Sequence, residues 1–194
     1  LMILWINLVT DSLPALSLGM EEAESDVMKK KPRKSNASLF AGRTGVDIVI
    51  QGIIQTGLVM AAFFIGTNIE AMDGARHEEA MTLAFVSLAL IQLFHSFSMR
   101  SQDHSILNRK LFANKYINLS FLIGVARTVF IVVVPGVNTA FGTVMINGVE
   151  WAISIAVAFA VIPCVEIYKL IVRLIQKHRA KKAASAEASP ASSL

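Results

Sequence analysis

The sequence predicts an all-α, polytopic membrane helix bundle of five transmembrane helices. The chain has 194 residues, of which 54% are apolar and only 16% are charged, whereas soluble domains carry roughly 25% charged residues. The apolar residues gather in five blocks, and each block is long enough to cross a bilayer core of about 30 Å. Because backbone groups inside a bilayer need internal partners, each block is expected to be a helix. This pattern excludes a soluble domain with a single core.

The five blocks define the expected domain organisation. The predicted spans are residues 1–18, 45–67, 80–99, 116–135 and 149–170. A Gly/Asn-rich turn over 136–148 separates the last two spans. Residues 180–194 are rich in Ala and Ser and lack aromatic side chains, so we expect a disordered tail there. Residues 1–179 are therefore predicted to form one transmembrane domain.

The distribution of basic residues predicts the orientation of the spans. Six Lys and Arg residues lie within 29–43, four within 100–115 and six within 169–182, whereas the loops on the alternate side carry only Arg76. Cytoplasmic loops are enriched in Lys and Arg. We therefore predict an integral membrane protein with its N-terminus outside and its C-terminus in the cytoplasm. Since the basic residues serve orientation, no nucleic-acid partner is expected.

The start of the sequence and its cysteine content exclude two further classes of protein. Residue 1 is Leu, and no basic segment precedes the first apolar block, so this block does not fit a signal peptide. We expect the chain to be a fragment whose partner is the missing N-terminal half of a larger protein. Cys164 is the single cysteine, which excludes a disulfide scaffold and suggests a small packing residue.

The first span carries an unusual set of polar residues. Asn7, Thr10 and Asp11 follow the i, i+3, i+4 spacing that places side chains on one face of a helix. Pro14 has no N–H, so the carbonyl of Thr10 loses its helical donor and the helix is expected to open there. Amide, hydroxyl, carboxylate and carbonyl oxygens are the hard ligands that calcium prefers. The alternative is a polar packing cluster with a proline kink, but a buried Asp costs several kcal/mol unless it is neutralised or paired.

Gln92 is a fourth candidate ligand, from the third span. At 1.5 Å per residue, Asp11 lies about 12 Å and Gln92 about 10 Å above the predicted cytoplasmic ends of their spans. The two side chains can therefore meet at one level. An interhelical hydrogen bond explains Gln92 alone equally well. His95, one turn away, is expected to be a packing residue because calcium sites prefer oxygen.

Other polar and small residues in the spans favour structural roles. Arg127 lies near the middle of the fourth span and needs a partner or a wet cavity, and Glu166 suits that role only if Arg127 snorkels downward. Pro163 is expected to kink the fifth span. Small residues allow helices to approach closely in membranes. In the second span these are Gly45, Gly52, Gly57 and Gly66.

The first span also carries a family resemblance. The stretch LWINLVTDSLPALSLG, residues 4–19, resembles the sixth transmembrane helix of type II P-type ATPases, the calcium-pump group. The similarity continues through ESDVM at 24–28 and KKPR at 30–33, which look like the loop between the family's sixth and seventh helices. The later spans resemble helices seven to ten, mainly by their order. The resemblance therefore covers the chain to about residue 179.

This resemblance implies ATP-driven cation export through an aspartyl-phosphate intermediate. By position, Asn7, Thr10 and Asp11 match ligands of the sixth helix, and Gln92 stands where the two-calcium sarcoplasmic reticulum pump has a Glu. The family thus implies calcium as the transported ion. Because Gln92 is neutral where that pump has a Glu, we expect one calcium per cycle. The DKTG and TGE motifs do not occur in these residues. ATP and Mg²⁺ are therefore expected to act only through the missing domains, and this chain alone is not expected to hydrolyse ATP or to contain catalytic residues.

Two alternatives remain open at the level of sequence. A stand-alone cation channel or carrier subunit would bind cations without an attached enzyme. Within the family, sodium/potassium and manganese pumps share much of the sixth-helix pattern. The short loops and plain tail suggest the plasma membrane of a bacterium, by analogy only. The expected partners are the lipid bilayer, the calcium ion and the rest of the pump.

Overall fold

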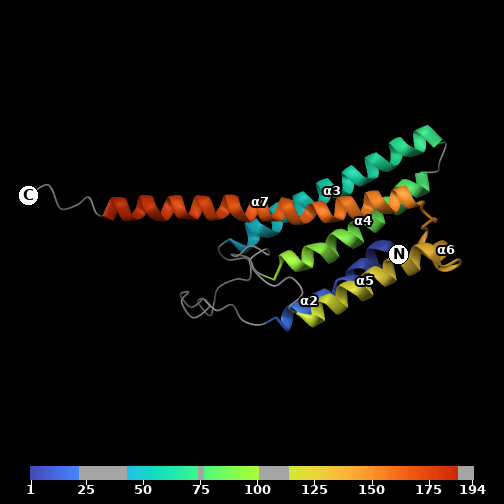
Figure 1. The fold of residues 1–194 in the computed structure, drawn as a ribbon, viewed down its shortest axis with the longest axis horizontal. Helices are drawn as coiled ribbons and strands as arrows, with labels where there is room; N and C mark the ends of the chain where they lie inside the picture. The colour runs from blue at the N-terminus through green and yellow to red at the C-terminus, as the bar shows by residue number, and fades with distance from the viewer. Residues whose placement is uncertain (22–42, 74–76, 101–113, 188–194) are drawn as a thin grey trace, which may run out of the picture.

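The computed structural model describes residues 1–21, 43–73, 77–100 and 114–187, and all of its regular elements are helices (Figure 1). The first span comprises α1 (Met2–Trp5), the π-helical segment η1 (Ile6–Thr10) and α2 (Ser12–Gly19). The remaining elements are α3 (Thr44–Asp73), α4 (His77–Ser98), α5 (Lys115–Val133), α6 (Val137–Phe141) and α7 (Gly148–Glu187). The described residues confirm the predicted all-α fold.

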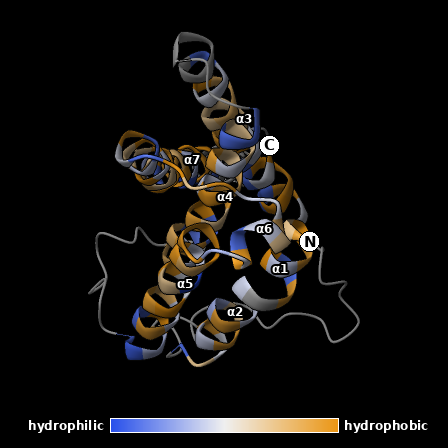
Figure 2. Cartoon of the chain, turned by 90° about the vertical axis from the view of Figure 1, so that its right-hand side faces the viewer, coloured by the Kyte–Doolittle hydropathy of each residue, from blue (hydrophilic) through white to orange (hydrophobic). Residues whose placement is uncertain are grey.

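Five helical segments in the described residues are long and apolar enough to cross a membrane. Figure 2 shows apolar residues along α5 and α7. Two helices extend beyond their apolar blocks, because α3 continues to Asp73 and α7 to Glu187. Residues 180–187, expected in a disordered tail, are therefore helical, in keeping with the high helix propensity of their Ala, Lys and Glu residues. Residues 188–194 lie outside the described residues.

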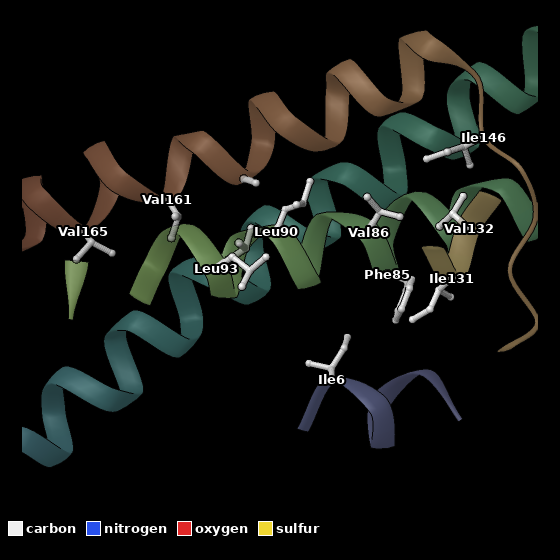
Figure 3. Packing of buried hydrophobic residues seen from close by; sticks show 12 residues of the cluster. Ile6, Phe85, Val86, Leu90, Leu93, Ile131, Val132, Ile146, Val161 and Val165 are labelled. Atoms are coloured by element: carbon white, nitrogen blue, oxygen red, sulfur yellow. The ribbon is translucent and has the colours of Figure 1, made fainter. Parts of the chain in front are cut away.

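Helix α4 lies at the centre of the bundle. It packs against α3, α5 and α7 and touches α2. Leu83, Ile91 and Leu93 of this helix are completely buried, and Figure 3 shows side chains of α4 meeting residues from the first span, α5 and α7. Helices in a bilayer gain little from the hydrophobic effect, so close van der Waals packing has to hold them together. Helix α5 is therefore positioned by its fit to α4, and the first span packs against both α5 and α4.

Two glycines mark the closest helix contacts. A Cβ atom at Gly66 of α3 would lie 3.1 Å from the backbone of Ala80 in α4, and one at Gly124 of α5 would lie 2.5 Å from Leu93. The predicted packing role is therefore confirmed for Gly66. At Gly52 and Gly57, by contrast, a Cβ atom would meet nothing within 4 Å among the described atoms.

The connection between α5 and α7, where a Gly/Asn-rich turn was expected, contains a helix. This short helix, α6, is flanked by Gly136 with φ 86° and Gly142 with φ 68°. Positive φ values are accessible to glycine without steric cost, so these two residues let the chain reverse direction on either side of α6.

Helix α7 runs through Pro163 without a break (Figure 1), although a kink was expected there. Val161 and Val165, on either side of the proline, are both fully buried. The helix thus stays continuous although Pro163 removes one backbone hydrogen bond.

Candidate cation site

The first span changes its winding just before Pro14. In η1 the Asp11 N–H donates to the carbonyl of Ile6, five residues earlier, at 3.0 Å, and regular α-helical bonding resumes where the Ala15 N–H donates to Asp11 at 3.0 Å. Pro14 itself is buried and has no N–H to offer the carbonyl of Thr10. The sequence predicts this opening of the helix but not its π-helical form. Single π-helical turns inside α-helices occur frequently at functional sites.

The three candidate ligands of the first span differ in burial. Thr10 is buried, Asp11 is partly buried and Asn7 is exposed on the described chain. The Ser12 hydroxyl, which follows them, donates to the carbonyl of Leu8 at 2.9 Å. Thr10 and Asp11 therefore face the described bundle, whereas Asn7 faces away from it.

The first span and α4 run side by side in a constant register. Ile6 and Phe85 share one apolar cluster, and Figure 3 shows Ile6 pointing toward Phe85. Two turns beyond Asp11, Leu18 packs against the cluster that contains Phe97. At the end of the span Arg100 donates to Glu21, a partner 79 positions away in the sequence. Ile6 and Phe85 are also 79 positions apart, and so are Leu18 and Phe97.

This register places Gln92 close to the level of Asp11. In the same register Gln92 is opposite residue 13, only two residues beyond Asp11, which corresponds to about 3 Å along the helix axis. Gln92 also lies seven residues after Phe85, so both side chains leave α4 on the same face, toward the first span. The helix positions allow the two side chains to meet, and their meeting stays a prediction.

The Gln92 side chain carries an available oxygen. Its Oε1 atom is buried and has no hydrogen-bond partner among the residues that the structure describes. A buried amide oxygen without a donor is costly, and coordination of a cation would satisfy it. His95 Nδ1 is also buried without a hydrogen-bond partner in this part of the chain, but a ring nitrogen is a poor ligand for a hard cation.

The described residues bring no cluster of acidic side chains to the depth of Asp11. No group of three or more His, Cys, Asp and Glu residues comes together within the described ranges. Glu166, considered above as a partner of Arg127, forms an ion pair with Lys169 at 3.6 Å. A cation site in this part of the chain would therefore combine the Asp11 carboxylate with neutral oxygen ligands.

A polar clamp that the sequence analysis missed holds the end of the first span. We use "the clamp" for Glu21, Arg100 and Asn114. The Arg100 Nη2 donates to Glu21 at 2.8 Å, and the Asn114 amide donates to the other Glu21 oxygen at 2.6 Å. Asn114 also accepts from the backbone of Tyr116 and so caps α5. An Asn directly before an apolar block is a helix-start signal, but the pairing of Glu21 with Arg100 has no local sequence signal.

A second polar group fixes the same end of the bundle. The Lys169 ammonium is buried and donates to the carbonyl of Ser98 at 2.6 Å, at the C-terminus of α4. Next to it, Tyr168 donates to Asp47 of α3 at 2.5 Å, and Asp47 also pairs with Arg43. The spacing of Glu166 and Lys169 was a local signal for part of this group. Together with the clamp, these contacts fix the ends of α2, α3, α4 and α7.

The sequence matches known proteins over most of its length. A family model described as "Cation transporting ATPase, C-terminus" matches residues 1–171. The chain is 38% identical over 180 residues to calcium-transporting ATPase 1 of Bacillus cereus, a match that covers 87% of this chain and 20% of the relative. It is 35% identical over 176 residues to a calcium-transporting ATPase of Listeria monocytogenes, with 88% and 19% covered. A calcium-transporting ATPase of Bacillus subtilis is 36% identical over 156 residues, with 80% and 17% covered. The chain thus spans about a fifth of the length of the curated relatives it matches.

Proposed function

Because this chain belongs to the family of cation-transporting ATPase C-terminal regions, we propose that it is the ion-binding membrane portion of an ATP-driven calcium-export pump. The observation that carries the proposal is the register between the first span and α4, which brings Asp11 and Gln92 to nearly one level beside the π-helical turn. The names of the relatives favour calcium and favour a pump over a stand-alone channel or carrier subunit.

The proposed ligands are Asn7, Thr10, Asp11 and Gln92. Asp11 supplies the negative charge that compensates a dication in a medium of low dielectric constant. Thr10 and Gln92 supply neutral oxygens from the described bundle, and Asn7 faces away from it, toward the place that further helices of a complete pump would occupy. The π-helical turn and Pro14 support the site by keeping backbone oxygens out of regular helical bonding.

In this proposal the energy for transport comes from the rest of the pump. ATP and Mg²⁺ act through those parts, and the described chain receives their effect through the helices that carry the ligands. The C-terminus lies in the cytoplasm, as the distribution of Lys and Arg favours, and the membrane is a bacterial plasma membrane, which the bacterial relatives favour. The integral membrane character itself follows from the five apolar helices and the family.

The decisive experiment changes the Asp11 carboxylate in the complete pump. We expect Asp11→Asn to raise the calcium concentration needed for half-maximal phosphorylation from ATP by tenfold or more, about 1.4 kcal/mol of binding free energy per factor of ten. Asn7→Ala is expected to have a smaller effect, because it removes a neutral ligand. The measurement is calcium-dependent phosphoenzyme formation in isolated membranes.

Asp47→Asn is the matched control. Asp47 is an aspartate that is more deeply buried than Asp11, but it is held by Arg43 and Tyr168 at the Arg100 end of the bundle. Its substitution is expected to leave the calcium midpoint within about threefold of the wild-type value. An unchanged midpoint in Asp11→Asn would remove the calcium site from the first span.

A further inference from the structure

The C-terminus of α4 is a buried helix end that lies close to Gln92. Gln92 stands six residues before Ser98, the last residue of α4, which corresponds to about 9 Å along the helix axis. The last carbonyls of a helix have no N–H of a following turn to accept from. Ser98 is only 1% exposed, so water has little access to this helix end. Its carbonyl therefore needs a donor from within the protein.

Lys169 of α7 supplies that donor. Its side chain is buried, and its ammonium donates to the carbonyl of Ser98 at 2.6 Å. The negative end of the helix dipole favours a cation at a helix C-terminus, and a charged donor makes a stronger hydrogen bond than a neutral one. Glu166, one turn earlier on α7, lies 3.6 Å from the ammonium and compensates its charge. Lys169 thus caps α4 from a neighbouring helix.

Apolar side chains make up much of the contact between α4 and α7. Leu90 and Leu93 of α4 share one cluster with Val161 and Val165 of α7, and Figure 3 shows Val161 pointing from α7 toward α4. The hydrophobic effect is non-directional, so this packing sets the distance between the helices more sharply than their height or rotation. A hydrogen bond has a preferred distance and angle. The Lys169 cap therefore adds the directional contact at this end of α4.

Two polar contacts connect the same end of α4 to both of its neighbours. Arg100 joins it to Glu21 at the end of the first span, and Ser98 joins it to Lys169. Gln92 leaves α4 toward the first span, whereas Lys169 approaches from α7. Any effect of Lys169 on Gln92 therefore passes through the backbone of α4.

We propose that Lys169 is a positioning residue for the proposed calcium site. Its ammonium caps α4, keeps the last turns of that helix wound, and so holds Gln92 at the level of Asp11. This inference rests on the proposed function, because it takes Gln92 as a calcium ligand.

The test measures calcium-dependent phosphorylation from ATP by the complete pump in isolated membranes. Lys169→Met keeps an unbranched side chain without the ammonium and is expected to raise the calcium concentration at half-maximal phosphorylation about threefold. Lys169→Arg retains a charged donor and is expected to keep this midpoint within about 1.5-fold of the wild-type value. Arg173→Met is the matched control, because Arg173 lies one turn further along α7 and also has buried nitrogens. It is expected to leave the midpoint unchanged.

A double-mutant cycle with Gln92→Ala separates positioning from a general loss of stability. Gln92→Ala removes the ligand itself, so Lys169→Met is expected to shift the midpoint by less than about 1.5-fold in that background. A purely structural role would lower the Tm and the amount of pump but would shift the midpoint by the same factor in both backgrounds. Equal shifts would therefore overturn the proposal.

The Asp11→Asn variant distinguishes a failure of this proposal from a failure of the proposed function. If Asp11→Asn raises the calcium midpoint while Lys169→Met leaves it unchanged, the positioning role fails and the site in the first span stands. If Asp11→Asn leaves the midpoint unchanged, the proposed function fails. Should Lys169→Met not accumulate in the membrane, Lys169→Gln, which is polar but uncharged, enters the same cycle with the same expected result.

Discussion

At the scale of single residues, Arg100 matters because it fixes the height of the first span, which carries three of the proposed ligands. Its side chain is only 5% exposed and that of Glu21 only 14%, so the pair is largely screened from water. Removing one partner of such a pair leaves the other charge without compensation. The clamp therefore positions Asp11 from ten residues away, through the backbone of α2.

We expect Arg100→Ala to destabilise the protein by about 3 kcal/mol, because Glu21 would lose the guanidinium that compensates its charge. Arg100→Lys is expected to recover part of this loss, since Lys can pair with a carboxylate but cannot form the forked contact of a guanidinium. Thermal unfolding in detergent measures both effects. Lys115→Ala, at an exposed position, serves as the control, and an equal loss in that variant would refute a specific role for the clamp.

At the scale of elements, Pro14 determines how the first span is wound. Pro14→Ala restores an N–H that can bond to the carbonyl of Thr10, so we expect η1 to convert toward a regular α-helix and the ligand side chains to rotate. The calcium midpoint of the complete pump should rise several-fold, while the amount of protein in the membrane changes little. Phosphorylation assays on equal amounts of pump test this, and an unchanged midpoint would mean that the winding is not part of the site.

The contact between α4 and α5 depends on the absence of a side chain at Gly124. Gly124→Ala places a methyl group 2.5 Å from Leu93, which is completely buried and has little room to move. We expect a loss of about 1–3 kcal/mol from overpacking. Gly57→Ala, where the new methyl group meets nothing within 4 Å of the described atoms, is expected to be neutral or slightly stabilising because Ala favours helix. Thermal unfolding compares the two variants.

At the scale of the whole molecule, Gln92 bears on how many calcium ions the proposed pump would transport. A neutral amide gives one weaker oxygen ligand, so a second dication would lack charge compensation. We expect one calcium per phosphoenzyme and a non-cooperative binding curve, further weakened by Gln92→Ala. Equilibrium binding of radioactive calcium to the solubilised pump, normalised to maximal phosphoenzyme, measures this ratio. A value near two with cooperative binding would reduce Gln92 to a packing residue.

Local properties of the sequence predict the spans and the candidate ligands but not the contacts between distant segments. The five apolar blocks suffice for the five membrane helices, since length and composition decide whether a helix can cross a bilayer. Pro14 predicts an opening of the first span because proline has no N–H wherever it stands in a helix. Gly66 packs closely and Gly57 does not, a difference that depends on neighbouring helices. The pair of Glu21 and Arg100 cannot be predicted from local sequence either, because the two residues lie 79 positions apart.

The continuation of α7 past the other helices has a consequence for the surrounding lipid. The apolar block of α7, residues 149–170, is about 33 Å long at 1.5 Å per residue and so matches a hydrocarbon core of about 30 Å. The turns that follow carry Arg173 and Lys177, and the helix continues to Glu187. Leu170 and Leu174 at this boundary are exposed. Basic side chains at the end of a membrane helix attract anionic lipid headgroups. The continuation of α7 thus gives the bundle a basic extension that favours anionic lipids at the membrane surface.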